Sequence, residues 1–246
     1  MRITFLGSGH GVPTAARHCT STMITAGGCA YLFDCGAPVA DCLAQAGVRV
    51  EDVRGVFLTH MHGDHTFGLP ALCSIASWYY RTSSFDVFFP EACGIDAMRA
   101  WILAADKSFD EERIRLHLFQ EGIVYADENV VVSAHRTEHM QNGLPSCAFV
   151  IEGEGQRIVI AGDLHHGDAR DFPVIARTEP SDAVVCELCH FPPSVIFPIA
   201  DACPTKRFFF HHVWGNVEAN LAAAAEFARR AKPLVITPSD GDAYDL

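Results

Sequence analysis

At 246 residues and 49% hydrophobic content, the chain is long enough for one large domain or two small ones and apolar enough to bury a large core. Its formal net charge of −12 argues against a broad nucleic-acid surface, because phosphate contacts require clustered lysine and arginine. It contains no apolar run of about 18 residues and its N-terminus lacks a signal-peptide apolar region, so we expect a cytoplasmic protein without membrane contacts. The ten cysteines are expected to be reduced thiols.

The first half of the chain is predicted to alternate short strands with helices. A strand at 2–6 runs into a glycine-rich turn, Gly7 to Pro13, whose glycines allow close backbone approach or positive φ. Gly27-Gly28 between two apolar stretches is a hairpin signal. The predicted elements that follow the turn are strands at 20–26 and 29–34, a helix at 37–46, a strand at 54–59, helical spacing at 66–80, a strand at 86–89 and a helix at 91–105.

The second half is predicted to contain more strands, several of them apolar throughout. Such runs suit strands that are buried on both faces of a sheet. No linker, low-complexity segment or charge run divides the chain, so we predict one α/β domain over residues 1–246. The predicted elements are strands at 114–119, 130–135, 146–152, 157–161, 184–187, 208–210 and 234–237, and a helix at 217–231.

A cluster of three histidines and an aspartate follows the strand at 54–59. His60 and His62 are two residues apart and can point the same way on an extended or tightly turned backbone. Asp64 and His65 follow in the next turn and could face a second point nearby. Imidazole nitrogen and carboxylate oxygen are ligands that zinc prefers, so this stretch predicts a metal site.

Further metal-competent residues stand at or just after the ends of later apolar strands. Asp163 follows the strand at 157–161, Glu187 ends the strand at 184–187, and His211 and His212 follow Phe208–Phe210. We therefore expect ligands to gather along one edge of the sheet.

In this order the chain resembles the metallo-β-lactamase fold superfamily, and within it the ribonuclease Z-like phosphodiesterase branch. The resemblance implies a four-layer αββα sandwich with two metal ions at one edge of the paired sheets. The motifs that carry it are Phe5-Leu6-Gly7-Ser8-Gly9, Phe33-Asp34-Cys35-Gly36, His60 to His65, Ala161-Gly162-Asp163 and the late histidine.

The resemblance also implies a ligand set. His60 and His62 would bind the first metal, Asp64 and His65 the second, and Asp163 would bridge both. The third histidine of the first metal is His139, with His135 as its competitor, and the last ligand is His212, with His211 as its competitor. We expect two Zn²⁺ ions, with Mn²⁺ or Fe²⁺ as alternatives, because all three metals occupy mixed histidine and aspartate sites.

Three further positions have expected roles. Asp34 is predicted to accept the N–H of a ligand histidine and fix its tautomer. Glu187 and His190 are either a surface pair or an acid pair near the metals, and the resemblance favours the acid pair. The separation of Cys186 and Cys189 gives a lone CxxC, a weak signal without a second pair.

The function predicted from these residues is a dinuclear metal-dependent hydrolase of small phosphodiesters. A metal-bridging hydroxide would attack, and Asp64 or Asp163 would orient it. His190, with its pKa tuned by Glu187, would protonate the leaving group. The alternatives are a tRNA 3′-processing endoribonuclease, a lactone or thioester hydrolase, and a non-catalytic metal-binding regulatory module.

The spacing disfavours the tRNA-processing alternative. His139 and Asp163 are only 24 residues apart, which leaves no room for a tRNA-gripping arm. Ala202-Cys203-Pro204-Thr205 stands where those enzymes carry a His-Ser-Thr stretch. We therefore expect a small-molecule substrate rather than nucleic acid, and the aromatic residues around Trp78 would line either a pocket or a homodimer contact.

Overall fold

The strands of the chain form two mixed sheets that pack face to face. The structure, a computed structural model, describes residues 1–12 and 14–246, so Pro13 of the predicted glycine-rich turn lies outside the described residues. The first sheet has the order β14 (Ala243–Asp245), β1 (Arg2–Gly7), β2 (Ser21–Ala26), β3 (Cys29–Phe33), β4 (Val53–Phe57), β5 (Phe85–Phe89), β6 (Ile114–Leu118). The second has the order β13 (Leu234–Ile236), β12 (Thr205–Val213), β11 (Ser181–Leu188), β10 (Gln156–Ile160), β9 (Ser146–Gly153), β8 (Val131–Thr137), β7 (Gly122–Ala126).

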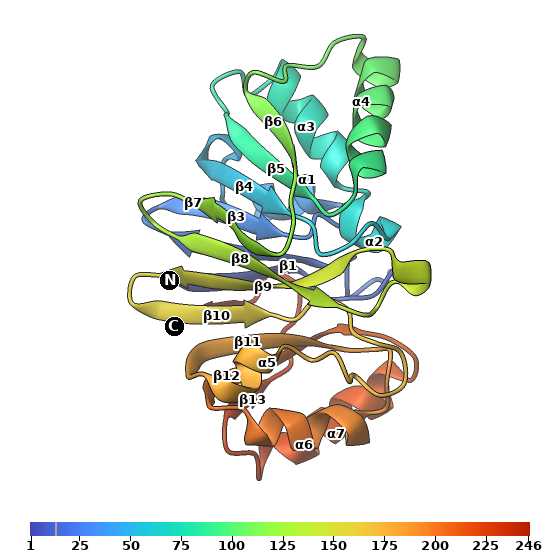
Figure 1. Cartoon of the computed structure of the whole chain (residues 1–246), viewed down its shortest axis with the longest axis vertical. Coiled ribbons are helices and arrows are strands. Elements are labelled where there is room, and N and C mark those ends of the chain that lie inside the picture. The colour runs from blue at the N-terminus through green and yellow to red at the C-terminus, as the bar shows by residue number, and fades with distance from the viewer. Residues whose placement is uncertain (13) are drawn as a thin grey trace.

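Helices cover the outer face of each sheet, which gives the predicted four-layer αββα sandwich (Figure 1). Buried residues of α1 (Val39–Gln45), α3 (Leu69–Trp78) and α4 (Ala92–Asp106) pack on the first sheet. Those of α5 (Val174–Thr178), α6 (Pro193–Ala202) and α7 (Val217–Ala228) pack on the second. Short 3₁₀ turns occur at η1 (Val50–Asp52) and η2 (Gln141–Gly143).

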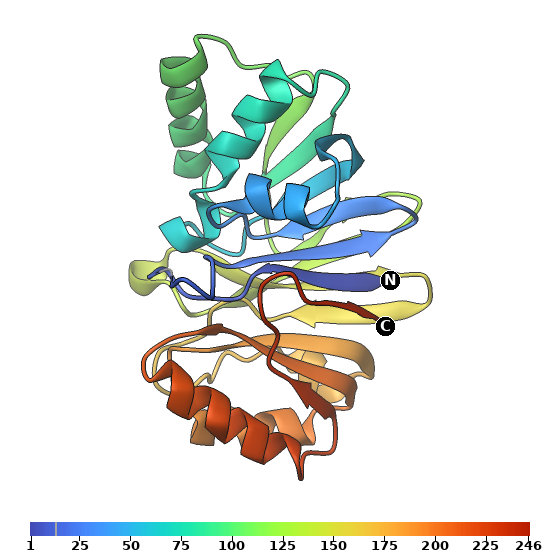
Figure 2. The same cartoon turned by 180° about the vertical axis from the view of Figure 1, so that it is seen from behind.

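Aromatic side chains fill the space between the two sheets. Phe57 is fully buried and its ring stacks on Phe33 at 5.0 Å and on Phe88 at 4.9 Å between centroids. Phe149 of the opposing sheet lies 5.8 Å from Phe57, edge to face. Figure 2 shows the two chain ends close together beside this core, where Arg2 of β1 pairs with Asp245 of β14.

The strand directions bring the ends of several strands to one edge. β3 to β6 run parallel in the first sheet, and β10 to β13 run parallel in the second. Loops that leave the carboxyl ends of these strands therefore meet at a shared edge, where ligands bind in open α/β sheets. The predicted metal residues lie in these loops or at these strand ends, except His139, which follows β8. β8 runs in the same direction as β10, because each is antiparallel to β9.

The structure corrects the predicted elements in several places. Of the predicted helical stretch 66–80, only Leu69–Trp78 (α3) forms a longer helix, and α3 has Pro70 in its first turn. A separate short helix, α2 (Gly63–Thr66), precedes it. Gly68 between them packs so tightly that a Cβ would lie 2.7 Å from the Gly36 carbonyl oxygen. This contact ties the Asp-Cys-Gly turn to the histidine cluster. The elements that were not predicted include β7, β14, α2, α5, α6 and the two 3₁₀ turns.

None of the helices formed by residues 1–12 and 14–246 is long and apolar enough to cross a membrane.

Candidate metal centre

The histidine cluster lies in the loop and helical turn that leave β4. Thr59 N–H donates to Asp34 Oδ1 at 2.8 Å, and Thr59 O accepts from Cys147 N–H of the second sheet. These bonds fix the backbone just before His60, which is fully buried. α2 then places Asp64 and His65 on one short turn.

Three imidazole rings converge at one end of the site. His60 Nε2 lies 3.0 Å from His62 Nδ1, which lies 3.2 Å from His139 Nε2. Four tetrahedral zinc–nitrogen bonds of about 2.0–2.1 Å would separate ligand atoms by about 3.3 Å. Burial lowers the pKa of all three histidines, so the neutral ring with a free lone pair is favoured in each. The three nitrogens therefore fit a metal ion.

A second group lies beside the first. Asp64, His65 and His212 bring their ligand atoms within 4.8 Å of one another, and His212 Nε2 is 3.2 Å from Asp64 Oδ2. His65 Nε2 is buried and has no hydrogen-bond partner among residues 1–12 and 14–246. Burial would lower the pKa of His212, but Asp163 and Asp64 raise it to about 10. A divalent cation would satisfy the same carboxylates and the orphaned nitrogen, so this group also fits a metal.

Asp163 lies between the two groups. It follows β10 and its side chain is almost fully buried. Burial opposes its charge, but His212 and His65 hold the pKa of this carboxyl well below its usual range. Its Oδ2 faces the ring nitrogens of His65 (3.4 Å), His212 (3.6 Å), His139 (3.7 Å) and His60 (3.9 Å). One carboxylate oxygen is therefore shared by both groups, as a bridging ligand would be.

Partners behind the rings orient them. Asp34 Oδ2 accepts the His65 Nδ1–H at 2.7 Å, which confirms the predicted contact between Asp34 and a histidine of the cluster. Thr59 Oγ1 lies 3.0 Å from His60 Nδ1. His139 Nδ1–H donates to the Leu164 carbonyl at 3.1 Å. Such partners fix the tautomer and leave the other nitrogen free for a metal.

An irregularity in the β11–β12 pairing gives His211 and His212 different surroundings. Glu187 pairs with His211 and Leu188 pairs with Val213, so His212 has no partner in the ladder. His212 has φ +49°, as expected at a bulge, and its ring faces Asp64. His211 instead lies against Phe5, with ring centroids 6.0 Å apart, and burial lowers its pKa to about 3.

The structure also separates His135 from His139. His135 belongs to β8, pairs with Ala148 and has its Nε2 3.1 Å from Ser133 Oγ. His139 lies beyond the end of β8 and reaches the cluster. Among the described residues, the groups of side chains that could hold a metal ion therefore include His139 and do not include His135.

Glu187 and His190 form a buried acid pair beside the two groups rather than a surface pair. Glu187 is fully buried, and its Oε2 accepts both the His190 Nδ1–H at 2.7 Å and the His190 backbone N–H at 2.8 Å. His190 Nδ1 is 3.7 Å from Asp163 Oδ2. Burial opposes protonation, but Cys189, Glu187 and Asp163 raise the pKa of His190 to about 11.

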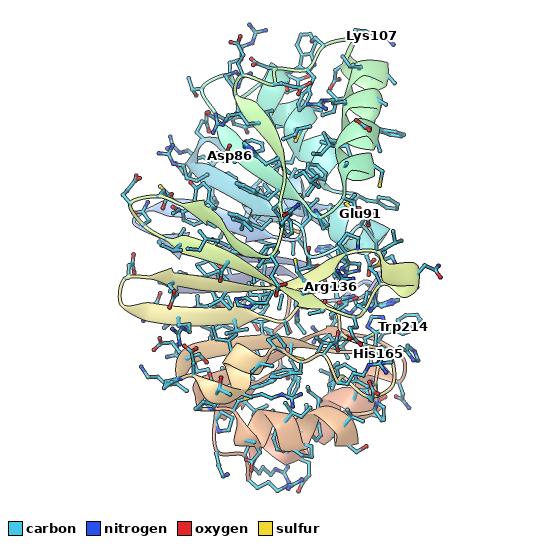
Figure 3. The ribbon with its side chains drawn as sticks, viewed as in Figure 1. Asp86, Glu91, Lys107, Arg136, His165 and Trp214 are labelled. Carbon is cyan, nitrogen blue, oxygen red and sulfur yellow. The ribbon has the colours of Figure 1, made fainter. Side chains whose placement is uncertain are left out.

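Residues outside the expected ligand set also border the centre. The His10 ring stacks on Trp214 at 4.7 Å and lies 5.1 Å from the His212 ring. Figure 3 shows Trp214 and His165 at the same end of the molecule. His165, in the loop after Asp163, has its Nδ1 2.7 Å from Asp168 Oδ1. Cys189 also lies in the centre, and only its place two residues after Glu187 could have indicated this.

Solved structures share this fold along the whole chain. The metallo-β-lactamase fold protein YhfI from Bacillus subtilis aligns with a TM-score of 0.78 at 18% identity and covers 99% of this chain and 98% of its own. The short form of human tRNase Z gives 0.73 at 22% identity, covering 100% and 99%.

Curated relatives are named ribonuclease Z. The protein of Anoxybacillus flavithermus is 27% identical over 191 residues, which is 76% of this chain and 60% of the relative. That of Pseudomonas putida strain W619 is 36% identical over 155 residues, 61% of this chain and 46% of the relative. The chain thus matches only part of the length of these relatives.

By its fold the chain belongs with the class of metallo-β-lactamase fold structures, and its sequence is similar to that of proteins named ribonuclease Z. Within that class, the family profile described as anti-Pycsar protein Apyc1 matches residues 1–184. The chain belongs to this family.

Proposed function

We propose that the chain is a phosphodiesterase that hydrolyses small phosphodiesters with two divalent metal ions. The observation that carries this proposal is the position of Asp163 Oδ2 between two separate ligand groups. The first group would be His60, His62 and His139, and the second would be Asp64, His65 and His212. When bound, two such ions activate a water molecule and neutralise charge on the phosphoryl oxygens.

The residues of the chain supply the rest of the chemistry. Although burial opposes this, the contacts of Asp64 with His212 and His65 lower its pKa. Asp64 therefore stays ionised and can accept a hydrogen bond from the attacking water. His190 is the proton donor to the leaving oxygen. Its Nδ1 is fixed by Glu187, which leaves Nε2 as the atom that can face substrate.

A small substrate is favoured by the connection between His139 and Asp163. These 24 residues are occupied by β9, the turn at Glu154-Gly155 and β10. The net charge of −12 is also unfavourable for an extended RNA surface.

Zn²⁺ is the ion we propose first, because five histidines surround the two positions. Mn²⁺ and Fe²⁺ remain the alternatives to be compared.

A second candidate is tRNA 3′ processing, favoured by the relatives named ribonuclease Z. A gel assay on precursor tRNA tests it directly.

The test of the main proposal is hydrolysis of bis(p-nitrophenyl) phosphate by protein supplied with Zn²⁺ or Mn²⁺. We expect turnover that needs the metal and exceeds turnover of lactone and thioester substrates. Precursor tRNA cleavage with no turnover of small phosphodiesters would instead favour the second candidate. Preferred turnover of a lactone or thioester would place the chain among carbonyl hydrolases.

A further inference from the structure

Cys189 places a thiol among the groups of the candidate metal centre. Its sulfur and the ligand atoms of Glu187, His190 and His212 all lie within 4.8 Å of one another. Glu187 and His212 are fully buried, while Cys189 is partly exposed and so remains accessible to an ion.

The backbone holds this thiol in place. Glu187 accepts the N–H of His190 at 2.8 Å with one oxygen and the N–H of Leu164 at 2.7 Å with the other. The His190 carbonyl accepts from Gly167 N–H at 2.8 Å. These hydrogen bonds fix the residues on both sides of Cys189, and so they fix the turn that contains it.

Cys189 does not act with Cys186 as a CxxC pair. Cys186 is fully buried and packs with Phe208 and Phe210 on the helical side of the second sheet. It is also absent from the described groups that could hold a metal ion. The thiol of Cys189 thus has two imidazoles and a carboxylate as its metal-competent neighbours.

We propose that Glu187, Cys189, His190 and His212 form an additional site for a thiophilic divalent cation, Zn²⁺ or Cd²⁺, that overlaps the two-metal centre at His212. A thiolate selects such ions over Mn²⁺ and Mg²⁺, which prefer oxygen ligands. On binding, a cation–sulfur bond replaces the S–H bond, and the proton passes to solvent. The cation also binds His190, the proposed proton donor, and His212 of the two-metal centre, so occupation of the site inhibits hydrolysis. This inhibitory consequence rests on the proposed function, whereas the binding does not.

Cadmium titration of Mn²⁺-loaded protein tests the binding. A cadmium–thiolate charge-transfer band in the ultraviolet should appear in the wild type and in Cys93→Ser, which removes an exposed thiol that is hydrogen-bonded to Glu91 and belongs to none of the described groups that could hold a metal ion. The band should be lost in Cys189→Ser and in Cys189→Ala, with unfolding midpoints confirming that each variant is folded. A band that persists in both Cys189 variants, or that is lost in Cys93→Ser, overturns the proposal.

The inhibition is measured separately on bis(p-nitrophenyl) phosphate. Excess Cd²⁺ or Zn²⁺ should inhibit the Mn²⁺-loaded wild type at a concentration at least about tenfold lower than Cys189→Ser, since even an outer partner of a metal ligand is typically worth 10- to 100-fold in affinity. Equal inhibition of both proteins overturns the inhibitory role. If no phosphodiester is turned over at all, the proposed function fails, and the charge-transfer band still decides whether the site exists.

Discussion

Replacing Asp34 by asparagine should weaken metal binding without disturbing the fold. Asp34 has φ +61°, a conformation that asparagine also tolerates. Its carboxylate accepts from Thr59 N–H at 2.8 Å and from His65 Nδ1–H at 2.7 Å with different oxygens. An amide has only one oxygen, so one of these two donors loses its acceptor.

The expected loss follows from the role of such partners. Removing the group that orients a metal-binding histidine typically lowers metal affinity 10- to 100-fold, or about 1.4–2.8 kcal/mol. The measurement is Zn²⁺ affinity of the apoprotein against a competing chelator.

A matched control is Asp86→Asn, which disrupts another aspartate–histidine contact, His117 Nε2 to Asp86 Oδ1 at 2.6 Å. Figure 3 shows Asp86 well away from His165 and Trp214. Asp86→Asn should keep the affinity of the wild type. If Asp34→Asn also kept it within about twofold, less than the usual effect of such a partner, the view that Asp34 supports a metal ligand would be wrong.

Three other outcomes are expected. His190→Ala should lower kcat by about 10²–10⁴ on a phosphodiester with an alkoxide leaving group and much less on a p-nitrophenyl ester, and equal effects on both would rule out a proton donor. Asp86→Asn should cost about 1 kcal/mol of unfolding free energy at pH 7, a value discounted for solvent exposure. Although burial opposes this, Arg115 and His117 lower the pKa of Asp86 below 3.8. The difference in unfolding free energy between the wild type and Asp86→Asn should therefore be present above pH 3.8 and shrink as the pH falls below it. A difference that stays unchanged at lower pH contradicts the assignment. Phe57→Ala should cost about 3–5 kcal/mol in urea unfolding, because its ring fills the space between the sheets, and a cost below 1 kcal/mol would contradict that packing.

The main strands and the grouping of the histidines could be predicted because they leave local signals. Apolar runs such as Ile158–Ile160 are buried on both faces, and the cluster at His60 to His65 is contiguous in sequence. Asp163 could be placed at the site because it follows one of these buried strands directly in the sequence. These features depend on hydrophobic periodicity and on the rule that the carboxyl ends of parallel strands meet at one edge of a sheet.

The missed elements lack such signals. β7 is an edge strand with Ile123 exposed, so no buried alternation marks it. α6 contains Pro198 in its interior, which argues against a helix in any sequence-based prediction. β14 has three residues and depends on pairing with β1, which lies at the other end of the chain.

The finer details of the site depend on tertiary geometry. The bulge that turns His212 toward Asp64 reverses the face that strict alternation along β12 would assign to it. Cys189 reaches the centre because Glu187 accepts a hydrogen bond from the His190 N–H and so fixes the turn that contains Cys189. Neither the bulge nor the hydrogen bond between Glu187 and the His190 N–H leaves a pattern in the linear sequence.

The two-metal centre is the central claim, and anomalous diffraction from a Zn²⁺- or Mn²⁺-soaked crystal tests it most directly. The account predicts two peaks on opposite sides of Asp163, about 3.5–4 Å apart. One peak should lie among His60, His62 and His139, and the other among Asp64, His65 and His212. A single peak at full occupancy, or ions bound away from Asp163, would contradict it.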